Sequence, residues 1–308
     1  MCGIVGYIGP RPVLPILIGG LKKLEYRGYD SAGCAVVTPD NTMLVFKAKG
    51  KVSNLEEKTK ECQQPCTLGI AHTRWATHGI PSETNAHPHL SQSGNLAIVH
   101  NGIIENYATL RDQLRKRGYT FKSETDTEVL VQLIEYIMNI RHSDLATSVR
   151  SALRLCIGAY AIAVVDRRVP TQMVAARKSS PLAIGIGKEN GEFFIASDAS
   201  PIAEYTNRIV YLNDEDVALI EQGKELQIEN LHSGSVDYEI KEVDLDLTML
   251  DKGGFPHFML KEIFDQPTVL KDCMRGRIIE RDGSLRVVLS AVEQHKQRLV
   301  SARRFTIV

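Results

Sequence analysis

Short apolar runs dominate the pattern of hydrophobic and polar positions along the chain. Residues 2–8 form an apolar run that ends at a Gly-Pro pair, which is typical of a buried strand. The leucines and isoleucine between residues 14 and 24 recur at helical spacing, which predicts a helix that ends near Gly28. Further buried strands are predicted over residues 35–37, 44–46, 68–72 and 96–100.

Three helices and then a long series of strands are predicted after residue 106. The helices are predicted over residues 107–116, 127–140 and 145–156. The strands follow as one extended β meander over residues 159–165, 173–176, 182–186, 193–196, 209–212, 217–220 and 226–229. Because helices and strands are segregated, the pattern favours an α+β fold with antiparallel sheets. Most strands are apolar on both faces, so we expect two stacked sheets with helices outside.

The pattern changes near residue 245. We expect one domain over residues 2–240, a linker over 241–256 and the beginning of a second domain over 257–308. In that last segment a helix is predicted over residues 259–264 and should end before Pro267, because proline interrupts a helix. Residues 305–308 resemble the first part of an apolar strand, and we therefore expect the second domain to be truncated.

Charge and hydropathy narrow the class of partner. The chain has 37 Lys+Arg and 37 Asp+Glu residues without a long charged run, which argues against nucleic acid or an anionic membrane as the main partner. Its longest apolar runs are far shorter than the roughly 18 residues of a membrane span. Pro10 and Pro12 interrupt the start of the chain before an apolar signal segment. We expect a cytoplasmic protein with reduced cysteines.

Cys2 is a candidate nucleophile because of its position. The initiator methionine is generally removed before a small residue, and Cys2 would then carry both a thiol and a free α-amine. Such an amine has a pKa of about 7.7–8.0, so that a useful fraction is neutral and can accept the thiol proton. This is the N-terminal nucleophile arrangement. The structural alternative is an ordinary buried cysteine at the start of a strand.

Other residues combine a structural and a chemical interpretation. Arg74 suits a carboxylate and Trp75 could cover a ligand, whereas the alternatives are a surface ion pair and a core anchor. Asn101-Gly102 is a hairpin signal, which its residues alone favour, or an oxyanion hole. Asp126 suits the first turn of a helix and could also accept a substrate ammonium group.

Metal binding is not predicted. The pair His87 and His89 lacks a cysteine or carboxylate ligand at a standard spacing. The pair Cys62 and Cys66 lacks a second pair of ligands. No cofactor is therefore expected.

Six motifs together resemble one family. They are CGIVG at 2–6, RGYDSAG at 27–33, HTRWATHG at 72–79, NAHPH at 85–89, HNGIIEN at 100–106 and SETDTEV at 123–129. The set resembles the class II glutamine amidotransferase family, in the form found in its aminosugar-forming branch. The resemblance implies an Ntn-hydrolase fold, which is a four-layer αββα sandwich of two antiparallel sheets, and hydrolysis of L-glutamine.

The resemblance also implies a role for each site residue. Cys2 would attack the side-chain amide of glutamine, and Asn101 with Gly102 would hold the oxyanion. Arg74 would bind the substrate α-carboxylate and Asp126 its α-ammonium group. The remaining positions are expected to line, cover or support the pocket: Thr77, His78, Trp75, Arg27 and His87.

Full-length enzymes of this branch pass ammonia to an α/β sugar-isomerase domain, which aminates fructose 6-phosphate, and they are expected to be homodimers. Residues 257–308 resemble the start of that domain, so we expect this chain by itself to be a glutaminase. Two alternatives stay open. One is another class II amidotransferase, such as the enzyme that begins purine synthesis, and the other is a non-catalytic regulatory fragment.

Overall fold

The computed structural model describes residues 2–76, 79–188, 191–243, 254–274, 278–281, 284–287 and 295–304. The chain divides into two compact units, Met1–Leu247 and Thr248–Val308. Among the described residues, no helix has the length and apolar character needed to cross a membrane.

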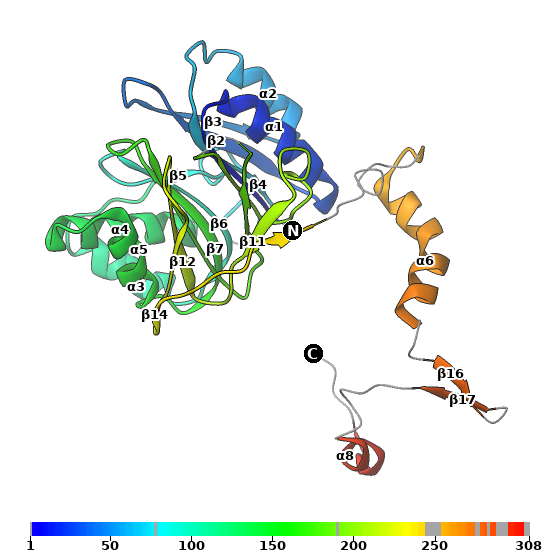
Figure 1. The fold of residues 1–308 in the computed structure, drawn as a ribbon. Helices are drawn as coiled ribbons and strands as arrows, with labels where there is room; N and C mark the ends of the chain where they lie inside the picture. The colour runs from blue at the N-terminus through cyan, green and yellow to red at the C-terminus, as the bar shows by residue number, and fades with distance from the viewer. Residues whose placement is uncertain are drawn as a thin grey trace. The chain divides into compact units, whose positions relative to one another are not determined.

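Two antiparallel sheets form the centre of the first unit (Figure 1). Within the described residues, the first sheet has the strand order β15-β11-β9-β10-β1-β4-β2-β3. Its strands are β1 (Gly3–Ile8), β2 (Ser31–Val37), β3 (Met43–Lys49), β4 (Leu68–Arg74), β9 (Ala183–Ile186), β10 (Phe193–Ala196), β11 (Arg208–Tyr211) and β15 (Lys241–Glu242). The second sheet has the order β14-β13-β12-β8-β7-β6-β5. Its strands are β5 (His89–Leu90), β6 (Leu96–Ile104), β7 (Gly158–Asp166), β8 (Gln172–Lys178), β12 (Asp216–Glu221), β13 (Gln227–Asn230) and β14 (Gly234–Ser235).

Helices cover the outer face of each sheet. α1 (Val13–Leu24) and α2 (Val52–Thr59) pack on the first sheet, and α4 (Asp126–Arg141) and α5 (Leu145–Leu153) pack on the second, with α3 (Tyr107–Arg115) beside α4. A separate apolar cluster fills each interface: one between each sheet and its helices, and a third between the two sheets. The expected α+β fold, with two stacked antiparallel sheets between helix layers, is confirmed.

The strands predicted after residue 158 are present, but they do not form one meander. The chain leaves β8 of the second sheet for β9, β10 and β11 of the first, and then returns to β12. A strand that is apolar on both faces fits either sheet equally well, because both sheets are covered on two sides. The pattern of single strands therefore does not determine which sheet each strand joins.

One short helix was not predicted. In α2, the residues Val52, Leu55 and Thr59 are buried at helical spacing, although charged residues surround them. The strands β5, β14 and β15 of the first unit were also missed, because two residues are too few to show a period.

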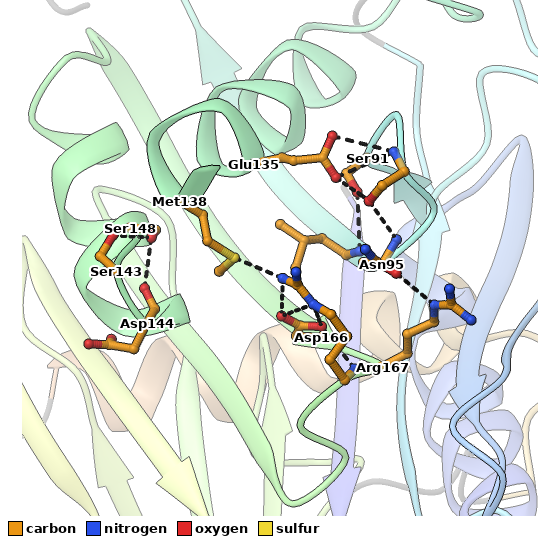
Figure 2. Close-up of polar contacts among 12 residues, drawn as sticks. Ser91, Asn95, Glu135, Met138, Ser143, Asp144, Ser148, Asp166 and Arg167 are labelled. Atoms are coloured by element: carbon orange, nitrogen blue, oxygen red, sulfur yellow. Dashed lines mark hydrogen bonds and ion pairs between the residues drawn. The ribbon is translucent and has the colours of Figure 1, made fainter. Parts of the chain in front are cut away.

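Polar contacts attach the second half of α4 to the sheet below it (Figure 2). The buried Glu135 carboxylate accepts a hydrogen bond from the hydroxyl of Ser93, in the turn between β5 and β6. The guanidinium of Arg168 donates to the buried Asp166 carboxylate at 2.7 Å and to the Met138 sulfur at 2.9 Å. Below them Arg167, directly after β7, donates to the side-chain oxygen of Asn95 at 2.8 Å and so joins the end of β7 to the turn between β5 and β6. We call these residues the α4 anchor.

The second unit contains α6 (Phe258–Met274), the strand pair β16 (Ile278–Arg281) and β17 (Ser284–Val287), and α8 (Lys296–Ser301). The prediction that a helix ends before Pro267 is wrong, because α6 continues through that residue. An interior proline removes one backbone hydrogen bond and strains one turn, but the turns on either side keep their own hydrogen bonds. Residues 244–253 of the expected linker and the expected strand 305–308 lie outside the described residues.

Candidate active site

Cys2 lies directly before β1, beside the end of β4. Since β1 and β4 are paired antiparallel, with Gly3 opposite Thr73, the residue after β4 is brought to the thiol. The backbone N–H of Trp75 donates a hydrogen bond to Cys2 Sγ at 3.1 Å. Burial raises the pKa of the Cys2 thiol above its ordinary value, against the opposing effect of that hydrogen bond. The thiol is therefore protonated at neutral pH and needs a base before it can act as a nucleophile.

Asn101 and Gly102 lie inside β6, so the hairpin interpretation is wrong. They pair with Ala161 and Tyr160 of β7, and the pairing continues to Ile104. Apolar residues on both sides continue the strand, and the glycine provides a positive φ of 128° within it. A Cβ atom at this position would lie 2.1 Å from the carbonyl oxygen of Ala159. Asn101 Nδ2 donates to the carbonyl oxygen of Cys2 at 3.3 Å, which brings this pair to the candidate nucleophile.

Arg74 is the last residue of β4 and is buried, so the surface ion-pair interpretation is wrong. Its guanidinium donates to the carbonyl oxygen of Gly79 at 3.1 Å and lies 3.7 Å from the carboxylate of Asp30. These contacts hold a cation at the point where the chain leaves the sheet.

Asp126 has the structural role considered for it and also lines the cavity. It begins α4, whose N-cap Thr125 accepts a hydrogen bond from the Glu128 N–H at 3.2 Å. The buried Asp126 carboxylate also accepts the Ile104 N–H at 2.7 Å. One contact thus ties the first turn of α4 to the end of β6, and the carboxylate faces the same cavity as Asn101.

A single cavity of about 380 Å³ brings together all the predicted site residues that are described. The predicted residues along its wall are Cys2, Arg27, Arg74, Trp75, His87, Asn101, Gly102 and Asp126. Thr77 and His78 lie outside the described residues. The lining residues that the sequence analysis missed are His100, Ile103, Thr125, Thr127, Ser180 and Pro181. The first four adjoin predicted residues within the same motifs, whereas no sequence signal marked Ser180 and Pro181.

Two further residues frame the cavity. Trp75 is 54% exposed, so it is not a core anchor. Its ring lies against Gly28, where φ is +84° and a Cβ atom would meet the ring at 2.3 Å. Arg27 forms an ion pair with Asp198. A broad aromatic side chain thus stands at the edge of the cavity, on a support that only glycine can provide.

Buried histidines lie behind Asn101. His72 Nε2 is 2.8 Å from Asn101 Oδ1, and His72 Nδ1 is 2.9 Å from His87 Nδ1. Burial lowers the pKa of His72 to about 3 and that of His87 well below its usual range. These imidazoles are therefore neutral at physiological pH.

Comparisons with known proteins agree with this geometry. Residues 72–204 match a family model described as a glutamine amidotransferase domain. The glutamine–fructose-6-phosphate aminotransferase (isomerizing) of Bacteroides thetaiotaomicron is 57% identical over 100% of this chain and 50% of that protein. The corresponding enzyme of Chlorobaculum tepidum is 50% identical over the same shares. The chain thus spans about half the length of the curated relatives it matches.

A solved structure supports the fold. The glutamine phosphoribosylpyrophosphate amidotransferase from B. subtilis is 25% identical, with a TM-score of 0.64 over 76% of this chain and 50% of that one. Its similarity confirms the Ntn-hydrolase architecture expected from the motifs. The chain therefore carries a class II glutamine amidotransferase domain, and along its whole length it is similar to about half of a glutamine–fructose-6-phosphate aminotransferase.

Proposed function

We propose that this chain hydrolyses L-glutamine to glutamate and ammonia, with the thiol of Cys2 as the nucleophile. The observation that carries the proposal is the meeting of Cys2, Asn101 and Gly102 with Arg74 and Asp126 in one cavity. It contains a nucleophile, two oxyanion donors, a cation and an anion. This set matches a zwitterionic amino acid with a reactive amide at the end of its side chain.

Arg74 and Asp126 orient the substrate. Glutamine carries an α-carboxylate and an α-ammonium group, and a cation and an anion on one wall distinguish the two. Both side chains are buried, so their charges act in a medium of low polarity. Trp75 covers the pocket, while Arg27 and His87 support it.

The first half of the reaction forms a thioester. Removal of Met1 exposes the α-amine of Cys2, which takes the proton of the thiol. The thiolate attacks the amide carbon of the glutamine side chain, and the carbonyl electrons move onto oxygen. Asn101 Nδ2 and the N–H of Gly102 stabilise this oxyanion. The amide nitrogen then takes the proton from the ammonium group of Cys2, and ammonia leaves.

Water completes the reaction. It attacks the thioester carbon while the α-amine accepts its proton, and the same two donors hold the second oxyanion. Collapse of this intermediate breaks the carbon–sulfur bond. Glutamate leaves, and the thiol regains its proton.

A glutaminase assay on Cys2→Ala beside the wild type tests the proposal. Loss of the nucleophile is expected to lower kcat by more than about 10⁴-fold, because no other group can form the thioester. The matched control is Cys273→Ala, since this cysteine is exposed and belongs to the second unit. Equal glutamate release by Cys2→Ala and wild type would show that the assignment of the nucleophile is wrong.

The role of the α-amine has its own measurement. Mass spectrometry of active protein should show Cys2 as the first residue. Full activity in protein that retains Met1 would contradict the amine as the base.

The activity of a longer protein is a further part of the proposal. Ammonia released here would aminate fructose 6-phosphate in a sugar-isomerase domain that begins in residues 257–308, after the linker 241–256. Residues 2–240 would be the glutaminase domain. We place the full-length enzyme in the cytoplasm as a homodimer. Identity of 57% to an aminosugar-forming relative favours this acceptor over phosphoribosylpyrophosphate, whose amidotransferase is 25% identical.

A further inference from the structure

A chain of buried polar groups runs from Asn101 to the start of α4. His72 contacts Asn101, His87 contacts His72, and the hydroxyl of Thr127 lies 2.9 Å from His87 Nε2. The same hydroxyl lies 2.9 Å from His100 Nδ1. Each of these side chains is at least nine-tenths buried. We call His72, His87, Thr127 and His100 the imidazole relay.

The contacts of the imidazole relay determine its protonation. Asn101 Oδ1 can only accept, so His72 Nε2 must carry a hydrogen. A neutral His72 then has a bare Nδ1, and His87 Nδ1 must donate to it. His87 Nε2 is consequently an acceptor for the Thr127 hydroxyl, whose oxygen accepts from His100 Nδ1. Three tautomers follow: Nε2–H for His72, and Nδ1–H for His87 and His100.

The imidazole relay has one alternative arrangement in which all three imidazoles are neutral and every hydrogen bond points the opposite way. Rotating the Asn101 carboxamide by half a turn would set its NH₂ group against the N–H of His72. To remove that clash, all three imidazoles would have to exchange tautomers and the Thr127 hydroxyl would have to turn. The two ends of the chain decide between the two states.

Both ends favour the same state. At one end, the carbonyl oxygen of Cys2 lies 3.3 Å from Asn101 Nδ2 and requires a donor there. At the other end, a carboxylate oxygen of Asp126 lies 3.9 Å from His100 Nδ1, and a negative charge at this distance favours an N–H on that nitrogen. Reversing the relay would therefore cost a favourable contact at each end.

We infer that the imidazole relay is a positioning device, which fixes the Asn101 carboxamide with its NH₂ group toward Cys2. This inference rests on the proposed function, because it gives that orientation a purpose. With the carboxamide reversed, an acceptor oxygen would face the developing oxyanion and repel it. The relay also links Asp126, at the substrate ammonium position, to the oxyanion donor.

The tautomers can be observed directly. In the ¹⁵N-labelled 308-residue chain, long-range proton–nitrogen spectra should show Nε2–H on His72 and Nδ1–H on His87 and His100. An Nδ1–H tautomer on His72, or a doubly protonated His72 at neutral pH, would overturn the inference. This measurement needs no substrate, so its outcome is independent of glutaminase activity.

Replacing Thr127 tests the catalytic consequence. Thr127→Val has nearly the same shape but cannot connect His87 with His100. We expect kcat for glutamine to fall by about 10- to 100-fold, less than deletion of the oxyanion donor costs, with KM nearly unchanged. Thr127→Ser keeps the hydroxyl and should restore most of the activity. Equal kcat values for the Val variant and the wild type would overturn the positioning role.

The two proposals fail differently. If Cys2→Ala released glutamate at the wild-type rate, the proposed function would be wrong while the predicted tautomers could still be found. If His72 showed the opposite tautomer and Cys2→Ala were inactive, the function would stand and the relay would be refuted. Thermal unfolding of Thr127→Val confirms that a folded protein was assayed.

Discussion

The two ends of α4 use buried polar groups in opposite ways. Its N-terminal end meets the imidazole relay, a series of buried, hydrogen-bonded side chains that ends on Asn101. Its C-terminal half meets the α4 anchor, where carboxylates are paired locally (Figure 2). There, Asp166 accepts from Arg168 and Glu135 accepts from Ser93.

The difference shows how a positioning network can be told from a structural one. In the α4 anchor each charge is satisfied by a near neighbour, and the contact holds the helix to the turns below it. In the imidazole relay His72 and His87 are neutral, and each hydrogen bond dictates the direction of the next. Among the described residues, the relay contains residues that line the cavity, whereas the α4 anchor contains none.

The largest expected effect on kcat is at Asn101 in β6, and Asn95, which lies directly before the same strand, is its matched control. Asn101→Ala should lower kcat for glutamine by about 10²–10³-fold, because it removes one of the two proposed oxyanion donors. Asn95→Ala removes a hydrogen bond acceptor of Arg167 in the α4 anchor and should leave kcat unchanged. Its free energy of unfolding should fall by about 1 kcal/mol. Steady-state kinetics with urea unfolding measures both, and a similar loss of kcat in the two variants would contradict the comparison.

Acid should lower the free energy of unfolding, because the buried histidines of the imidazole relay resist protonation in the folded state. The folded state holds the pKa of His72 at about 3, against the ordinary value of 6.5, so only the unfolded chain binds a proton between these values. Stability is therefore complete above pH 6.5 and falls as the pH drops, by about 1.4 kcal/mol per pH unit for each such histidine. Urea unfolding at several pH values between about 7.5 and 4, which cover the upper part of this window, measures the slope.

Two variants test whether His72 causes this dependence of stability on pH. His72→Gln should reduce it by about 1.4 kcal/mol per pH unit. His142→Asn, at the exposed C-cap of α4, should leave it unchanged, because asparagine also tolerates the left-handed conformation there. The relay is not the source of acid sensitivity if both variants keep the wild-type slope.

The smallest effect is expected in the α4 anchor. Ser93→Ala removes the hydroxyl that donates to Glu135, and we expect the free energy of unfolding to fall by about 1 kcal/mol. The value of kcat for glutamine should not change. Loss of activity without loss of stability in this variant would mean that the anchor also acts on the cavity.

Local features of the fold were predictable from the sequence, and long-range ones were not. The pattern of apolar and polar residues located the strands and helices, because these elements depend on near neighbours along the chain. They failed where partners are distant: β9 to β11 join the other sheet, and Asn101-Gly102 continues a strand instead of turning. Helix α6 continues through Pro267 because the hydrogen bonds of its other turns outweigh the unfavourable helix propensity of one proline.

The site was predictable as a set of residues but not as an arrangement. The predicted site residues that the structure describes all lie within the six motifs, and all of them line the cavity. The four members of the imidazole relay also lie within these motifs, but the sequence does not show that they contact one another, because they come from β4, the segment before β5, β6 and α4. The stacking of β4 on β6, which belong to different sheets, and the packing of α4 on β5 and β6 bring them together.

The support of Trp75 on Gly28 has a practical consequence. The chain contains one tryptophan, so its intrinsic fluorescence reports on a single place, the edge of the cavity. That indole is 54% exposed, and its emission therefore starts close to that of a solvated ring. Any ligand that draws the ring away from water will shift the emission to shorter wavelength, which makes occupancy of the cavity readable without a label.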